Sequence, residues 1–345
     1  MKTRGYAALS ADKPLAPFEF ERRAPGDWDV QIEIDFCGIC HSDIHFTRNE
    51  WGMTTFPCVP GHEIIGRVVK TGKDATRFKE GQRVGVGCFV NSCRVCGSCK
   101  GGHENYCSTG FTMTYGSMQA DGKTPTFGGY SNQIVVDEHF VLRIPEGLDP
   151  AAAAPLLCAG ITTYSPLRQV DLKSGSRVAI MGLGGLGHMG VKLAASFGAE
   201  VTVLSGSPKK EADAKRLGAH EFVLTSKEGA LAKLAGRYDA ILDTISAKHD
   251  INGPLNCLRP EGTLIVVGAP PSLEFSPFAL IFGHRKIMGS LVGGIPETQA
   301  MLDHCGAHGI TSDIEMTTPD RINEAFERTV SGDVKYRFVI DCAKF

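Results

Sequence analysis

The chain has 345 residues, which exceeds the size at which a single hydrophobic core keeps growing, so two domains are expected. Its 36 basic and 38 acidic side chains nearly cancel, and this balance excludes the basic surface that binds nucleic acid. No apolar run approaches the roughly 18 residues of a membrane span, and residues 1–10 contain no apolar signal segment. We therefore expect a cytoplasmic protein that binds neither nucleic acid nor membranes.

The first third of the chain is predicted to be rich in β-structure. Apolar and polar residues alternate over 30–36, the pattern of a half-buried strand. The segments 62–69 and 133–141 are short and β-branched, and turn-rich stretches separate them. These features predict a many-stranded, partly barrel-like domain.

From about residue 151 the sequence becomes Ala-rich and helical, and apolar strands then alternate with amphipathic helices. The expected helix is 186–197, and the expected strands are 177–181, 200–204, 238–243, 263–268 and 287–292. Such alternation predicts a doubly wound parallel sheet. A β-type segment at 337–340 could return to the first domain. The expected domains are 1–153 with 295–345, and 154–294.

Twelve cysteines in a large chain without an export signal favour metal ligation over disulfides. Six of them have no recognisable ligand spacing and are expected to be buried thiols: Cys37, Cys58, Cys88, Cys257, Cys305 and Cys342.

Four other cysteines lie close together in a Gly- and Ser-rich loop: Cys93, Cys96, Cys99 and Cys107. Four thiolates can close a tetrahedral shell around zinc with no open position, which is typical of a structural site. A redox or disulfide cluster and an iron–sulfur cluster are alternatives. A nucleic-acid-binding zinc finger is disfavoured because the neighbourhood is not basic.

Residues of the kinds that bind metals lie in two groups, one after the first predicted strand and one at the start of the second. Cys40, His41, Asp43 and His45 lie in the first group, and His62-Glu63 forms the second group. From spacing alone these side chains could bind a metal or could be packed or solvated.

A glycine-rich loop lies between the predicted strand 177–181 and the following helix: Gly182, Leu183, Gly184, Gly185, Leu186 and Gly187. In this context glycines allow a tight turn and the close approach of a pyrophosphate to the helix N-terminus. The loop therefore predicts dinucleotide binding.

The end of the next strand lacks the carboxylate that would bind the adenosine ribose of NAD. It carries instead two hydroxyls and two ammonium groups, which could bind a 2′-phosphate: Ser205, Gly206, Ser207, Lys209 and Lys210. NADP(H) is thus favoured over NAD(H). The alternative is a solvated loop that leads into a helix.

Taken together, Cys40-His41-Ser42-Asp43, Gly61-His62-Glu63, the four-cysteine loop and the glycine loop resemble the zinc-containing medium-chain alcohol dehydrogenases over nearly the whole chain. Gly129-Tyr130-Ser131 and the segment 158–164 resemble the cinnamyl alcohol dehydrogenase branch, which includes broad-range NADPH aldehyde reductases of microbes. The resemblance implies a GroES-like catalytic domain, a Rossmann-type cofactor domain and a homodimer.

The resemblance also implies residue roles. Cys40, His62 and Cys158 would hold a catalytic zinc that Glu63 can approach, and Asp43 would brace His62. Ser42 would accept the alcohol proton and pass it through the nicotinamide ribose to His45. Further positions would line the cofactor or an apolar substrate pocket: Thr162, Thr244, Gly268, Ser290, Leu291 and Val292 for the cofactor, and Trp51 and Phe89 for the pocket.

The predicted function is therefore a zinc-dependent alcohol dehydrogenase or aldehyde reductase with two zinc ions per chain. It would use NADP(H) with a primary alcohol or aldehyde, aromatic or medium aliphatic. Residues 111–113, just past the cysteine loop, depart from the plant members of the branch. The alternatives are a polyol or sugar dehydrogenase of the same superfamily and a non-catalytic zinc- or nucleotide-binding scaffold.

Overall fold

The computed structural model describes residues 1–345, and the chain divides into two compact units. Unit 1 comprises Met1–Cys158 and Gly293–Phe345, and unit 2 comprises Ala159–Val292. None of the helices has the length and apolar character needed to cross a membrane.

Unit 1 is built on a seven-stranded sheet in which strand β8 pairs with β3 outside the main order β16-β17-β3-β4-β5-β9. The strands are β3 (Asp29–Gly38), β4 (Ile64–Thr71), β5 (Arg83–Val86), β8 (Gln133–Asp137), β9 (Leu142–Arg143), β16 (Ile314–Thr317) and β17 (Arg337–Asp341). Two smaller pairs accompany it, β1 (Lys2–Ala7) with β2 (Ala16–Glu21) and β6 (Phe89–Asn91) with β7 (Thr112–Met113).

The alternating pattern of β3 places one face of this strand in the core of unit 1. Val30, Ile32 and Ile34 are at most 1% exposed. The expected return of the C-terminal segment is confirmed, since β17 pairs antiparallel with the end of β3, with Ile340 opposite Cys37. Through this pairing the C-terminal segment, which begins with Arg337, joins unit 1 beside the end of β3 at Gly38.

The prediction of one β-segment over 133–141 is wrong in its second half. Strand β8 ends at Asp137, where the side chain of Asp137 accepts a hydrogen bond from the backbone N–H of His139 at 2.9 Å. This cap starts the 3₁₀ turn Glu138–Phe140, and β9 begins only at Leu142.

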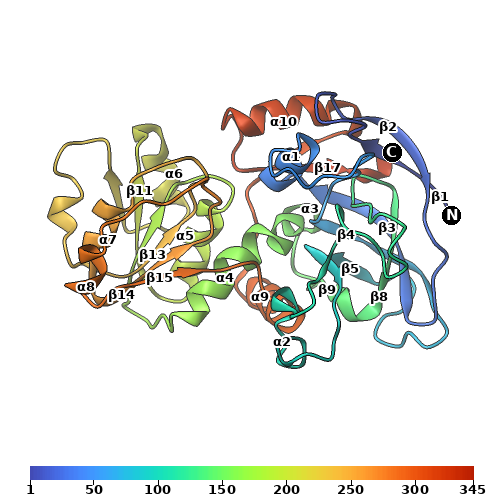
Figure 1. The fold of residues 1–345 in the computed structure, drawn as a ribbon, viewed down its shortest axis with the longest axis horizontal. Helices are drawn as coiled ribbons and strands as arrows, with labels where there is room; N and C mark the ends of the chain where they lie inside the picture. Colours follow the sequence, from blue (N-terminus) through green and yellow to red (C-terminus); the bar gives the residue numbers. More distant parts are fainter. The chain divides into compact units, whose positions relative to one another are not determined.

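The helices of unit 1 are short except for two near the C-terminus. They are α1 (His41–Thr47), α2 (Gly97–Lys100), α3 (Pro150–Ala153), α9 (Ile295–His308) and α10 (Ile322–Val330). Within this unit α1 and α10 lie near β17 (Figure 1). Helix α1 follows β3 directly, which fixes the position of the residues at its N-terminus.

Unit 2 is the doubly wound parallel sheet that the sequence predicts, in the order β12-β11-β10-β13-β14-β15. Figure 1 labels β11, β13, β14 and β15 of this sheet. Its strands are β10 (Arg177–Met181), β11 (Glu200–Ser205), β12 (Glu221–Leu224), β13 (Tyr238–Asp243), β14 (Leu258–Val266) and β15 (Lys286–Gly289). Its helices are α4 (Ala159–Gln169), α5 (Gly187–Ser196), α6 (Glu211–Arg216), α7 (Asn252–Cys257) and α8 (Phe278–Ile281).

Three details of unit 2 differ from the sequence-based expectation. Strand β12 is not predicted, because its four residues are all only partly buried and lie at the edge of the sheet. The last strand ends at Gly289 rather than at residue 292, since Val292 has a positive φ of 41° that a strand cannot contain. Strand β14 spans Leu258–Val266 rather than 263–268, because the N–H groups of residues 267 and 268 both donate to the carbonyl of Asp243.

Candidate active site

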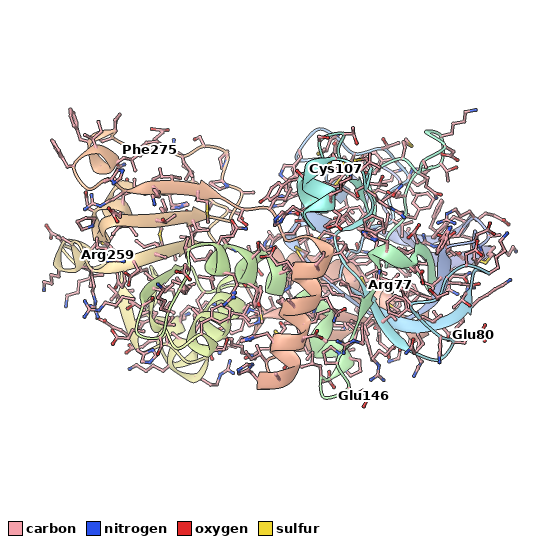
Figure 2. All side chains as sticks on the ribbon, turned by 90° about the horizontal axis from the view of Figure 1, so that it is seen from below. Arg77, Glu80, Cys107, Glu146, Arg259 and Phe275 are labelled. Atoms are coloured by element: carbon pink, nitrogen blue, oxygen red, sulfur yellow. The ribbon has the colours of Figure 1, made fainter.

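The four clustered cysteines meet in one lobe of unit 1. One ligand atom from each of Cys93, Cys96, Cys99 and Cys107 lies within 4.8 Å of the others. Helix α2 and the 3₁₀ turn Glu104–Tyr106 carry the chain around the sulfurs. Cys107 lies in this lobe in Figure 2. The lobe thus offers four thiol donors from one short loop.

Backbone N–H groups of the lobe point at its sulfurs. Cys93 donates to Cys107 Sγ at 3.4 Å, Cys96 donates to Cys93 Sγ at 3.4 Å, and Cys99 donates to Cys96 Sγ at 3.5 Å. The N–H groups of Cys99 and Ser108 lower the pKa of Cys96 to about 5, and the Thr109 hydroxyl and the Cys93 N–H lower that of Cys107 to about 7. The loop therefore favours the thiolate, the form that binds metal, at Cys96 and Cys107, whereas burial raises the pKa of the Cys99 thiol to about 11.

A second ligand set is assembled from three distant parts of unit 1. Cys40 precedes α1, His62 and Glu63 precede β4, and Cys158 follows the 3₁₀ turn Ala154–Leu157. One ligand atom from each of the four lies within 4.8 Å of the others, and all four residues are buried. The sulfurs of Cys40 and Cys158 are 3.9 Å apart.

Asp43 holds two parts of this set together from a fully buried position. Its Oδ1 lies 3.3 Å from Nδ1 of His62 and accepts the Gly61 N–H at 3.0 Å. Its Oδ2 accepts the Cys40 N–H at 2.9 Å and the Tyr130 hydroxyl at 3.2 Å. The contact with Nδ1 leaves Nε2 of His62 available as a ligand.

Glu63 has one carboxylate oxygen in use and one without a partner. Oε1 accepts a hydrogen bond from Nη2 of Arg337, whereas Oε2 is buried and has no hydrogen-bond partner. A Cβ on Gly38 would lie 1.9 Å from Oε2, so only glycine leaves room for the carboxylate. Burial, opposed by the charge of Arg337, raises the pKa of Glu63 to about 7. A buried oxygen with no partner at a ligand cluster is consistent with a cation nearby.

The two thiols of this set have pKa values shifted in opposite directions, because hydrogen bonds to Cys40 and Cys88 raise the pKa of Cys158 well above its usual range. The hydrogen bond from Cys158 and the nearby Arg337 guanidinium lower the pKa of Cys40 well below its usual range. Cys88 is closer to this set than its sequence context indicates, because a hydrogen bond with Cys158 lowers the pKa of the Cys88 thiol. Arg337, Tyr130 and Cys88 carry no spacing signal that would have identified them from the sequence as partners of the set.

The residues predicted to move a proton lie on α1. Sγ of Cys40 lies 3.6 Å from Oγ of Ser42, and His45 contacts Oε2 of Glu50 through Nδ1. The ring of Trp51, which is 42% exposed, has its centroid 4.9 Å from that of His45. Ser42 and Trp51 thus lie beside predicted site residues.

Phe89 is placed differently from Trp51. It is 4% exposed, and its ring centroid lies 5.5 Å from that of Phe111 and 6.1 Å from that of Phe140. This packing is that of a core aromatic residue, so the structure adds no support for its predicted role in a substrate pocket.

In unit 2 the glycine loop connects β10 to α5. Gly182 has a φ of +84°, and a Cβ on Gly187 would lie 2.1 Å from the carbonyl oxygen of Gly182. A Cβ on Gly184 would meet nothing within 4 Å. The loop is therefore a tight turn whose backbone at Gly184 is open to a ligand, as a dinucleotide site requires.

The other predicted cofactor residues lie at strand ends or on α4. Ser205 ends β11, its hydroxyl accepts the Ser207 N–H at 3.2 Å, and Lys209 is exposed on the turn that follows. Thr244 directly follows β13, and its hydroxyl donates to the Met181 carbonyl at 2.7 Å. The hydroxyl of Ser290 is buried without a hydrogen-bond partner. The remaining positions of this set are Gly206, Lys210 and Gly268 near strand ends, Leu291 and Val292 after β15, and Thr162 on α4.

The donor chemistry of both ligand sets fits zinc. Structural zinc takes four closed ligands, often four thiolates, whereas catalytic zinc keeps an open position beside three protein ligands. The lobe supplies four thiols and so fits the closed kind of site. The second set supplies two thiols, an imidazole and the unpartnered carboxylate oxygen, and so fits the kind that keeps an exchangeable position.

Comparisons with known proteins agree with this geometry. Residues 26–146 match the alcohol dehydrogenase GroES-like domain, and residues 185–307 match the zinc-binding dehydrogenase family. NADP-dependent alcohol dehydrogenase C 1 of Mycolicibacterium smegmatis is 54% identical over 98% of this chain and 97% of its own length. Aldehyde reductase YahK of Escherichia coli is 51% identical over 99% of this chain and 98% of its own length.

A solved structure extends the agreement to the whole fold. A cinnamyl alcohol dehydrogenase from Sorghum bicolor superposes with a TM-score of 0.96 at 47% identity, covering 99% of this chain and 98% of its own. The predicted fold class, a GroES-like domain with a parallel-sheet cofactor domain, is confirmed. The chain belongs to the zinc-binding alcohol dehydrogenase family.

Proposed function

We propose that this protein is an NADP-dependent zinc alcohol dehydrogenase that interconverts primary alcohols and aldehydes. The observation that carries the proposal is the buried cluster of Cys40, His62, Glu63 and Cys158, whose ligand atoms lie within 4.8 Å of one another. Full-length relatives named as an NADP-dependent alcohol dehydrogenase and an aldehyde reductase support the same activity.

Cys40, His62 and Cys158 would hold the catalytic zinc, and the unpartnered oxygen of Glu63 would be able to approach it. Zinc supplies Lewis-acid chemistry that lowers the pKa of an alcohol and polarises the carbonyl of an aldehyde. Asp43 holds the imidazole of His62 in the tautomer that leaves Nε2 free for the metal. The four thiols of the lobe would hold a second, structural zinc.

Ser42 and His45 would handle the proton. A hydroxyl next to the ligand Cys40 can accept the alcohol proton in oxidation and return it in reduction. The imidazole of His45 can both accept and donate a proton, and it would pass the proton onward beside the Glu50 carboxylate. Trp51 packs on His45 and would give this side of the site an apolar wall.

Unit 2 would bind the cofactor. The glycine loop would receive the pyrophosphate at the N-terminus of α5, and Ser205, Ser207, Lys209 and Lys210 would contact the 2′-phosphate of NADP. NADP(H) supplies the hydride acceptor or donor. We propose unit 2 as the cofactor domain and unit 1 as the catalytic domain.

The decisive experiment follows the absorbance of NADPH and NADH in parallel against a panel of aromatic and aliphatic aldehydes. We expect turnover with NADPH to exceed that with NADH. Faster turnover with NADH would refute the proposed phosphate contacts. In the reverse direction, oxidation of a polyol faster than of any primary alcohol would favour the alternative polyol dehydrogenase, and the absence of turnover would favour a scaffold.

We also propose a homodimer formed through unit 2. Strand β15 ends the order of the sheet. Helix α8, which precedes β15 in the chain, exposes Phe278 (62%) and Ile281 (66%), and its C-cap residue Phe282 is 84% exposed. Phe275 lies close to this helix at the outside of the unit (Figure 2). An unpaired strand edge beside apolar side chains suits a second copy of the same surface.

Sedimentation velocity would test this interface. We expect the wild type to sediment as a dimer and Phe282→Glu to sediment as a monomer, because the charge would be buried against its copy. The matched control is Met53→Glu, which changes a 56% exposed apolar side chain of unit 1. A wild-type monomer, or a Phe282→Glu variant that remains dimeric, would contradict the proposal.

The two thiol-rich clusters need reduced cysteines, which favours a reducing compartment. We therefore propose that the protein works in the cytoplasm.

A further inference from the structure

Unit 2 contains a buried acid–base pair that the proposed chemistry does not use. Asp243 is the last residue of β13 and is fully buried, and the side chain of His249 is only 14% exposed. Nε2 of His249 lies 2.8 Å from Oδ2 of Asp243, and Nδ1 of the same ring lies 2.8 Å from the carbonyl oxygen of Ala247. Both ring nitrogens of His249 therefore face oxygen atoms.

A neutral imidazole beside an ionised carboxylate has one proton fewer than the two contacts of the His249 ring need. A neutral ring has a single N–H and can satisfy only one of the two oxygens, because a carbonyl and a carboxylate only accept. A second proton completes both contacts, either on the ring or on the Asp243 carboxyl, which would then donate to Nε2. Burial is the largest influence on the Asp243 carboxyl and raises its pKa, which helps the pair to keep that proton.

The pair brackets the segment Thr244–Ala247, which passes along the proposed cofactor loop. Oδ1 of Asp243 accepts the Ile245 N–H at 3.0 Å. A Cβ on Gly268 would lie 2.3 Å from the carbonyl oxygen of Ile245, and a Cβ on Gly182 would lie 3.0 Å from the Thr244 hydroxyl. The segment is thus in close contact with two glycines that we place at the dinucleotide.

Few other charges face His249. Asp250 is close enough for its charge to be felt, but its carboxylate accepts hydrogen bonds from Asn252 and Gly253. Lys248 points to Glu274, with Nζ 3.0 Å from Oε1. The glycine loop and residues 267–269 contribute no charged side chain. Asp243 is therefore the charged group in direct contact with the ring.

We propose that His249 and Asp243 are positioning residues that hold the Thr244–Ala247 segment in place for NADP(H) through one shared proton, so that cofactor affinity falls when this proton is lost. The inference rests on the proposed cofactor site in unit 2. Affinity is highest at the low-pH side, where the pair holds the proton. It decreases as the pH rises and the pair loses this proton, because one of the two contacts of the ring then lacks a hydrogen.

The test measures the Kd of NADPH for the zinc-loaded enzyme by fluorescence between pH 7 and 9.5. In this window the 2′-phosphate, whose second pKa is about 6, is largely ionised, and the small further ionisation above pH 7 would strengthen binding rather than weaken it. For the wild type we expect the Kd to rise about fivefold, the effect of losing one hydrogen bond. The midpoint should coincide with the transition in the ¹⁵N resonances of the His249 side chain.

Two variants separate a proton-bearing pair from a purely structural contact. In Asp243→Asn the amide N–H donates to neutral His249, and the amide oxygen still accepts the Ile245 N–H, so no extra proton is needed. We expect this variant to bind NADPH as tightly as the wild type at pH 7 and to keep that Kd up to pH 9.5. His249→Ala should bind about fivefold more weakly at every pH. Asp250→Asn is the matched control and should keep the wild-type pH profile.

The inference is overturned if the wild-type Kd stays constant over this range, or if Asp243→Asn weakens binding as His249→Ala does. A wild type that binds no NADPH at any pH would instead contradict the proposed function. Binding without pH dependence would contradict only the inference.

Discussion

The two thiol-containing ligand sets of unit 1 differ in how the chain builds them. The lobe takes four sulfurs from one loop, and its own backbone N–H groups donate hydrogen bonds to three of them. The second set joins Cys40, His62 and Cys158 from distant segments and depends on Asp43, Arg337 and Gly38 for its geometry. Four thiols from one loop suit a structural ion with a closed ligand shell. The second set includes a carboxylate oxygen without a partner, and it suits an ion that exchanges ligands during chemistry.

The largest expected effect on turnover comes from removing a ligand of the second set. Cys40→Ser should reduce aldehyde reduction by more than about a hundredfold, because replacing residues that only support a ligand already costs 10- to 100-fold. The Kd of NADPH, measured by fluorescence, should remain close to that of the wild type, because the glycine loop and the residues proposed to contact the 2′-phosphate belong to unit 2.

The control is Cys305→Ala, which removes a buried thiol outside both ligand sets. Its turnover should stay near that of the wild type. Unchanged aldehyde reduction by Cys40→Ser would remove the main support for the catalytic role of this set.

Removing the brace of His62 should have an intermediate effect. Asp43→Asn should lower turnover and zinc affinity about 10- to 100-fold, because the amide can no longer attract the imidazole N–H as a carboxylate does. Steady-state kinetics with added zinc would measure both. Asp35→Asn, which breaks only the partly exposed pair with Arg67, should leave both quantities unchanged. Equal effects of the two substitutions would argue against the brace.

The smallest expected effect on turnover comes from the lobe. Cys99→Ser should lower kcat by less than about threefold at 25 °C while reducing Tm by about 5–10 °C, because a structural zinc contributes to folding rather than to chemistry. Thermal unfolding followed by circular dichroism, together with kinetics, would measure this difference. A loss of turnover as large as that of Cys40→Ser, with an unchanged Tm, would reverse the roles assigned to the two ligand sets.

The difference between ligands from one loop and ligands from distant segments also determines which features the sequence predicts. The lobe and the glycine loop are predictable because their residues are neighbours along the chain, so that spacing reflects geometry. The second ligand set could be anticipated only through family resemblance, since its residues come together by folding. The contact of Arg337 with Glu63 depends on the return of β17 to β3, and no local sequence pattern predicts it. The contact of Tyr130 with Asp43 depends on the packing of a distant loop, which no local pattern predicts either. The His249–Asp243 pair is close in sequence, yet its proton count becomes visible only when both ring nitrogens are placed.

The proposal that each of the two ligand sets holds one zinc ion is tested most directly by the metal content of the purified wild-type protein, measured by elemental mass spectrometry. The account predicts two zinc ions per chain, one for each ligand set. A protein without zinc, or one that contains iron in its place, would contradict it.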